Sequence, residues 1–152
     1  MPRSRKTLVS IDATPYYHCS SRCVRRAFLC GKDALAGKSF AHRRQWIEDK
    51  LLELATVFAI DLAAYSVMHN HYHVVLFIDK STADNWDALE VVECWHLLFS
   101  GTSYSQRFSK VELLTAAEQA SLDASIALWR ERLMDISWFM RTINEGHSPY
   151  GE

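Results

Sequence analysis

The sequence predicts an α+β fold in which an antiparallel sheet has helices packed mainly on one face. Two kinds of pattern indicate this class: β-rich runs separated by a short break, and stretches whose apolar residues recur at helical spacing. The 152 residues are 49% hydrophobic and 23% charged, a composition that suits one globular domain over residues 1–152. The elements follow the order strand, helix, strand, strand, helices, which is typical of α+β architecture.

Three runs rich in aromatic and β-branched residues predict the strands. Residues 16–24 form the first run, which begins after Pro15. Residues 60–68 and 71–78 form the other two and are separated only by His69-Asn70. Because Asn tolerates positive φ, we expect this break to be the turn of an antiparallel hairpin.

Apolar periodicity predicts the helices, over residues 39–58, 84–99, 115–133 and 135–145. Ser39 is the expected N-cap of the first helix, and Gly101 is expected to close the second. Thr115 and Glu118 have the spacing of a capping box, in which each side chain accepts from the other residue's backbone N–H.

Charge is divided unevenly along the chain. Residues 1–50 hold 11 Lys/Arg and 4 Asp/Glu, a net charge of +7, whereas residues 51–152 hold 6 and 14, a net charge of −8. Such asymmetry favours a basic face that binds a polyanion, although a solvated charge run balanced by the acidic part is the alternative. The arginines expected to contact phosphates are Arg22, Arg25, Arg26, Arg43 and Arg44.

The chain has no apolar run of the roughly 20 residues that a membrane span needs, and no apolar stretch follows Met1–Lys6 as in a secretory signal. We therefore expect a cytoplasmic protein with no membrane contact. Its four cysteines are then expected to be free thiols. Cys19 and Cys23 have a zinc-like spacing, but the chain lacks a matching second pair.

His71 and His73 are the main candidates for metal ligands. Period-two alternation places both side chains on one face of their strand, where two imidazoles can share a divalent cation. Strand histidines that bind backbone groups are the alternative interpretation. The third ligand stays open among His18, Asn144 and Glu145.

The run YSVMHNHYHVVL, residues 65–76, resembles the hairpin of the single-tyrosine HUH transposases, in which a Met-x-Asn-His-hydrophobic-His pattern binds the metal. The most similar group is the repetitive-palindrome-associated transposases, where Pro usually stands in place of His69. Residues 17–22 are similar to that family's opening strand, and residues 135–145 are similar to the start of its later helix.

The resemblance implies a ferredoxin-like sheet, a helical insertion over about 79–134, a divalent metal (Mg²⁺ or Mn²⁺) and a possible homodimer. It also implies cleavage and rejoining of single-stranded or hairpin DNA through a phosphotyrosine. The family's tyrosine is expected just after Glu145, where this chain has Gly146-His147-Ser148-Pro149, so the candidate nucleophile is Tyr150, with Tyr104 as a second. The alternatives are a DNA-binding remnant without catalysis and a small metal-dependent hydrolase.

Overall fold

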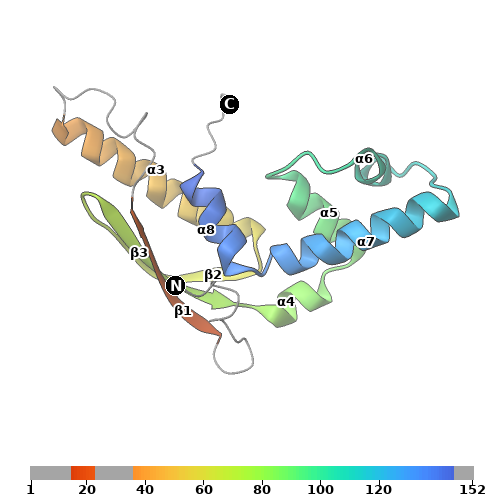
Figure 1. Ribbon diagram of the computed structural model, residues 1–152, viewed down its shortest axis with the longest axis horizontal. Helices are drawn as coiled ribbons and strands as arrows, with labels where there is room; N and C mark the ends of the chain where they lie inside the picture. Colours follow the sequence, from red (N-terminus) through yellow and green to blue (C-terminus); the bar gives the residue numbers. More distant parts are fainter. Residues whose placement is uncertain (1–14, 23–35, 146–152) are drawn as a thin grey trace, which may run out of the picture.

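An antiparallel sheet of three strands, in the order β1-β3-β2, forms one end of the molecule (Figure 1). The computed structural model describes residues 15–22 and 36–145. The strands are β1 (Tyr16–Arg22), β2 (Ile60–Val67) and β3 (His71–Ile78). Since β3 pairs antiparallel with both neighbours, β1 and β2 run parallel to each other on either side of it. The α+β class is confirmed.

The predicted hairpin is confirmed and joins β2 to β3. The amide of Met68 donates to the carbonyl of His71 at 2.8 Å and closes the turn. The register shifts between Leu62 and Ala64, which marks a bulge in β2. Beyond it, Ser66 lies opposite His73, so the hairpin end carries the candidate histidines.

Two helices, α3 (Ala36–Val57) and α8 (Ile136–Asn144), cover one face of the sheet (Figure 1). Alternate residues of β3 are buried against them, and the fully enclosed side chains in this layer include Leu51, Leu54, Tyr72, Val74, Leu76, Phe139 and Met140. The rings of Phe58 and Phe139 meet edge to face with centroids 5.3 Å apart. The predicted helix over 135–145 is therefore confirmed, and Asp135 caps it by accepting from the amide of Ser137.

The remaining helices are α4 (Lys80–Asn85), α5 (Ala88–His96), α6 (Ser103–Ser109) and α7 (Ala116–Arg132), which extend beyond one end of the sheet (Figure 1). Helices α5, α6 and α7 pack against one another. The indoles of Trp95 and Trp129 stack at 5.2 Å between α5 and α7. The capping box of Thr115 and Glu118 is confirmed at the start of α7.

Two sequence predictions about helices were wrong, and one helix was not predicted. The helix predicted over 84–99 is two helices, because Trp86 is extended and Asp87 begins α5 with a capping box to Glu90. Helix α6 was not predicted, although Thr102 and Ser105 cap it in the same reciprocal way. Finally, α3 begins at Ala36, so Ser39 lies inside the helix rather than at its N-cap.

Within the described ranges, none of the helices combines the length and the hydropathy that a bilayer crossing needs. Cys94 carries a free thiol, and Cys19 is buried. The other two cysteines, Cys23 and Cys30, lie outside the described residues.

Candidate functional site

The sheet face opposite α3 and α8, here called the open face, carries most of the candidate site. Residues that pair directly across antiparallel strands share a face, so the register defines its members. They are Tyr16, His18, Ser20 and Arg22 of β1, Asp61, Ala64 and Ser66 of β2, and His71, His73, Val75 and Phe77 of β3. These residues are all exposed or half-buried, whereas their neighbours on β3 are buried.

His71 and His73 lie side by side on the open face, as alternation along a strand requires. Their ring centroids are 5.0 Å apart and the rings meet at 74°. Tyr72, between them in sequence, points to the opposite face and is only 1% exposed. Burial of Tyr72 thus fixes the side on which both imidazoles stand.

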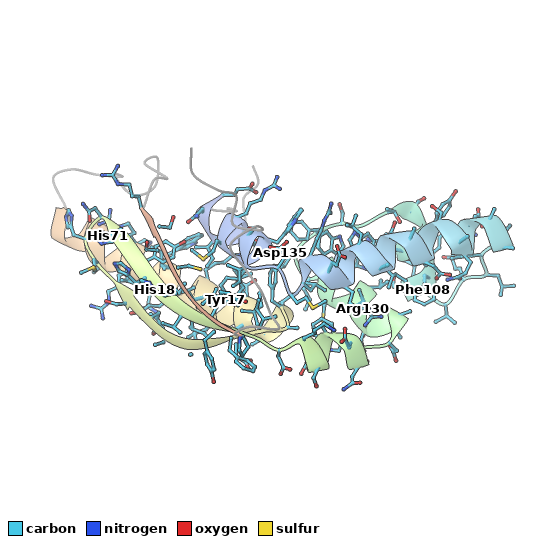
Figure 2. The ribbon with its side chains drawn as sticks, turned by 60° about the horizontal axis from the view of Figure 1, so that its bottom comes forward. Tyr17, His18, His71, Phe108, Arg130 and Asp135 are labelled. Atoms are coloured by element: carbon cyan, nitrogen blue, oxygen red, sulfur yellow. The ribbon has the colours of Figure 1, made fainter. Side chains whose placement is uncertain are left out.

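His18 comes from β1 and completes a row of three imidazoles. Its Nε2 lies 3.2 Å from Nδ1 of His73, and the two rings stack nearly parallel with centroids 5.2 Å apart. Figure 2 shows His18 and His71 at the same end of the sheet, away from α7. Of the three candidates for a third ligand, His18 is the one that the structure brings beside the pair.

Hydrogen bonds to the Nδ1 atoms determine which nitrogens are left for a metal. Nδ1 of His71 lies 2.7 Å from Oδ1 of Asn70. Because an amide oxygen only accepts, that Nδ1 carries the proton and the Nε2 of His71 keeps its lone pair. In His73, Nδ1 faces Nε2 of His18, and the Nε2 of His73 is available to a metal in the tautomer whose Nδ1 donates to His18. Sequence reasoning did not give Asn70 this role.

This donor set suits a transition-metal ion. Imidazole nitrogens are ordinary ligands of Zn²⁺, Ni²⁺ and Fe²⁺, whereas Mg²⁺ and Mn²⁺ prefer oxygen ligands. The described residues contain no group of three His, Cys, Asp or Glu side chains placed to bind one ion. The pair therefore fits Mg²⁺ or Mn²⁺ only when water and phosphate oxygens complete the coordination.

The other two third-ligand candidates lie at the end of α8, which packs on the covered face. Oδ1 of Asn144 accepts a hydrogen bond from the hydroxyl of Tyr72 at 2.5 Å. The carboxylate of Glu145 accepts from Nε of Arg141 at 2.6 Å. Both groups are engaged away from the imidazoles.

The arginines expected to contact DNA have different surroundings. Arg22 is exposed at the end of β1, directly opposite His71. The guanidinium of Arg43 donates to the backbone carbonyl of His69 in the hairpin turn, and that of Arg44 pairs with Glu48 at 3.1 Å. Arg25 and Arg26 lie outside the described residues. Among the described arginines of this group, only Arg22 lies on the open face.

The candidate nucleophile Tyr150 also lies outside the described residues. Tyr104 belongs to α6, which packs against α5 and α7 rather than against the sheet. Tyr16 is on the open face, where its ring contacts Phe77 at 4.9 Å. Phe77 follows His73 by four positions, which corresponds to roughly 13 Å along the strand.

A pocket of about 410 Å³ opens beside His71 and is lined by Ser20, Ser21, Arg22, Asn70 and His71. The two serines were not candidate residues, because no local pattern distinguishes them from other strand serines. The register pairs Ser20 with His73 and so brings Ser20 to the site, whereas Ser21 pairs with Tyr72 and lines the pocket as the chain neighbour of Ser20 and Arg22.

A larger pocket of about 570 Å³ lies on α5 and is lined by Trp86, Glu90, Glu93, Cys94, His96 and Leu97. Burial, with Glu90 and Glu93 nearby, raises the pKa of the Cys94 thiol, so this cysteine is kept in its unreactive protonated form. Burial also lowers the pKa of His96. With two carboxylates in its lining, this pocket is a poor site for a phosphate.

Comparisons of the chain with protein-family models, with curated proteins and with solved structures found no match.

Proposed function

We propose that this protein binds single-stranded or hairpin DNA on the open face and acts as a metal-dependent DNA strand transferase of the HUH transposase type. The observation that carries the proposal is the pair His71 and His73, which stand together on the sheet face that none of the described helices covers and whose Nδ1 atoms both have hydrogen-bond partners. The third imidazole, His18, and the cation of Arg22 lie on the same face.

In this proposal, His71 and His73 hold a divalent cation, Mg²⁺ or Mn²⁺. When bound, the cation polarises the scissile phosphate and offsets its charge. The nucleophile is a tyrosine hydroxyl, with Tyr150 as the candidate. Its oxygen loses a proton and forms a bond to phosphorus, the bond from phosphorus to the 3′ oxygen breaks, and that oxygen takes up a proton to become the 3′ hydroxyl. Since one phosphoester replaces another, rejoining needs no nucleotide cofactor.

We also propose that the sheet belongs to a ferredoxin-like arrangement. The unit β1-α3-β2 places two parallel strands on either side of β3, which is the split βαβ connection of such sheets. Helices α4 to α7 then correspond to the helical insertion over about 79–134. We also propose that the protein is cytoplasmic and forms a homodimer.

A DNA-binding remnant without catalysis is the second candidate function. The observation that favours it is the segment after Glu145, which has Gly146-His147-Ser148-Pro149 where the similar transposases have their tyrosine. In this case the open face binds DNA and no covalent adduct forms.

The decisive experiment is to incubate the protein with hairpin DNA labelled at its 3′ end and Mn²⁺ and then to denature the mixture. Strand transfer predicts a labelled protein–DNA adduct that resists denaturation and is lost in Tyr150→Phe and in His73→Ala. The matched control is His42→Ala, which removes an exposed histidine of α3 and should leave the adduct unchanged.

Binding without an adduct excludes strand transfer and supports the remnant. Failure to bind DNA at low salt excludes both functions, because contacts to phosphates are strongest there.

A further inference from the structure

The described residues that line the pocket beside His71 include several hydrogen-bond donors. Arg22 contributes a guanidinium, Ser20 a hydroxyl and Asn70 an amide, while the hydroxyl of Ser21 donates to the backbone carbonyl of Arg22 at 3.4 Å. Oδ1 of Asn70 is taken by His71, so the part of this amide left for a ligand is its NH₂ group. None of the described residues that line the pocket is Asp or Glu.

Arg22 brings a positive charge to this pocket without a neutralising partner in the described residues. Its side chain is exposed and forms no ion pair with a described carboxylate, whereas Arg44, Arg107 and Arg141 each do. A guanidinium with hydroxyl and amide donors around it matches the acceptor oxygens of a phosphate.

The register makes this pocket continuous with the histidine pair. Arg22 lies opposite His71 and Ser20 opposite His73, at the end of β1 that meets the hairpin turn. His71 belongs to both places, because its ring lines the pocket and its Nε2 is left for a metal. A phosphate in the pocket therefore lies next to a cation on the pair.

We propose that this pocket is a phosphate-binding subsite, which holds a backbone phosphate of the single strand while the histidine pair holds the metal. That the phosphate belongs to DNA rests on the proposed function, whereas the binding of a phosphate group does not. The volume of about 410 Å³ is ample for a phosphate with part of its sugar, within the usual range for small-ligand sites.

Because His71 belongs to both the pocket and the histidine pair, binding of the metal and binding of the phosphate should strengthen each other. A cation on His71 attracts a phosphate in the adjacent pocket, and by linkage the phosphate strengthens cation binding by the same factor. We expect Mn²⁺ to tighten the binding of inorganic phosphate roughly 5-fold or more, the lower end of typical couplings.

The first test titrates inorganic phosphate into the full chain and follows the amide signals of Ser20, Arg22 and Asn70 by NMR. We expect these signals to shift together, and Arg22→Gln to raise the dissociation constant at least 5-fold. The matched control is Arg44→Gln, which removes an equally charged, exposed side chain of α3 and should change nothing. The proposal would be overturned if both variants lost the same affinity for phosphate, or if the amide signals of the wild type did not shift.

The second test distinguishes DNA phosphate from free phosphate. The affinity for an unlabelled single strand is measured against salt concentration, and each phosphate contact contributes roughly 0.7 to the slope. Arg22→Gln should reduce the slope by about one such contact, and Arg44→Gln should not. If Arg22→Gln weakens phosphate binding but leaves the DNA slope unchanged, the pocket binds free phosphate and the DNA part of the proposal is wrong.

The outcomes also separate this proposal from strand transfer. A reduced slope in Arg22→Gln without any covalent adduct supports the subsite and excludes the strand-transfer reaction. An adduct with an unchanged slope supports strand transfer and excludes the binding of a DNA phosphate in this pocket.

Discussion

The hydroxyl of Tyr72 donates to Oδ1 of Asn144 at 2.5 Å and so joins the central strand to the end of the last helix. Tyr72 is 1% exposed and lies between His71 and His73 in the chain. The contact is therefore made on the covered face directly behind the candidate metal pair. It couples the placement of α8 to the position of the two imidazoles.

The contribution of this hydrogen bond to the free energy of unfolding should be measurable. Tyr72→Phe leaves the amide oxygen of Asn144 without its donor, and we expect a loss of about 1–3 kcal/mol in the free energy of unfolding. Asn144→Ala should cost a similar amount, and the double variant should cost less than the sum by about 0.5 kcal/mol or more. Urea unfolding of all four proteins gives the coupling. Strict additivity would mean that the hydrogen bond contributes nothing.

His18 should act on the metal through His73. With its Nε2 3.2 Å from Nδ1 of His73, it orients that ring, and when it accepts the Nδ1 proton it leaves the other nitrogen of His73 for the ion. We expect His18→Ala to raise the dissociation constant for Mn²⁺ roughly 10- to 100-fold, as measured by calorimetry. His18→Gln keeps a hydrogen-bonding group and should recover part of the affinity.

The control for this prediction is His42→Ala, which removes an exposed histidine from α3. Nitrogen-15 NMR of His73 supplies a second measurement, because loss of the His18 contact should change the proportions of its two tautomers. Unchanged Mn²⁺ affinity and an unchanged tautomer in His18→Ala would show that His18 is only a neighbour.

Arg43 and Arg44 are adjacent in the chain, but their substitutions should lower the free energy of unfolding by different amounts. The half-buried Arg43 binds the carbonyl of His69 and ties α3 to the hairpin turn, so Arg43→Ala should cost about 1.5–3 kcal/mol. Arg44 forms an exposed pair with Glu48 one helical turn away, and Arg44→Ala should cost about 0.5 kcal/mol or less. Hydrogen exchange at Met68 and His71 should speed up only in Arg43→Ala. Equal effects of the two substitutions would contradict a structural role for Arg43.

Val111 carries local strain that a substitution should relieve. It has a φ of 61°, which a β-branched residue rarely adopts, and its side chain is 90% exposed, so little packing holds it there. We expect Val111→Gly to raise the free energy of unfolding by about 0.5–1 kcal/mol, after the entropy cost of glycine. Leu113→Gly is the control, since Leu113 is 91% exposed with no positive φ and should lose stability or stay neutral.

His96 should make the helical part of the molecule sensitive to mild acid. Burial lowers its pKa below the ordinary 6.5, so the folded protein favours the neutral imidazole, which hydrogen-bonds Oγ of Ser105 at 2.9 Å. The unfolded chain then takes up a proton first as the pH falls. The contribution of His96 is present above pH 6.5 and declines as the pH falls from there through the lowered pKa.

Thermal melts of the wild type and His96→Gln between pH 8 and pH 5 test this sign. The stability advantage of the wild type should shrink below about pH 6.5. Glu118 changes stability in the same direction, but its pKa is lowered from 4.5 by the hydrogen bond from the Thr115 backbone, so its effect falls at more acidic pH. An advantage that grows on acidification would contradict the prediction for His96.

Features set by neighbours in the chain could be predicted from the sequence. Alternation over 71–78 placed His71 and His73 on one face, and the Thr115–Glu118 spacing marked the start of α7. The limits of α8 and of the hairpin also followed from local pattern. The two helix starts that were missed, at Asp87 and Thr102, have capping boxes as well. Apolar periodicity continues across the boundary between α4 and α5, so it does not reveal the start at Asp87, and α6 is too short to show a clear period.

What only the tertiary structure decided is how distant segments meet. His18 and His73 are 55 positions apart, and nothing local determines that β1 pairs with β3 in the register that stacks their rings. The same register gathers Ser20, Arg22 and Asn70 around one pocket, while Tyr72 holds Asn144 on the opposite face. Local spacing fixes which way a side chain points from its own strand, whereas packing of the whole core selects the strand that lies beside it. The sequence by itself therefore determined the histidine pair, and the fold determined what surrounds it.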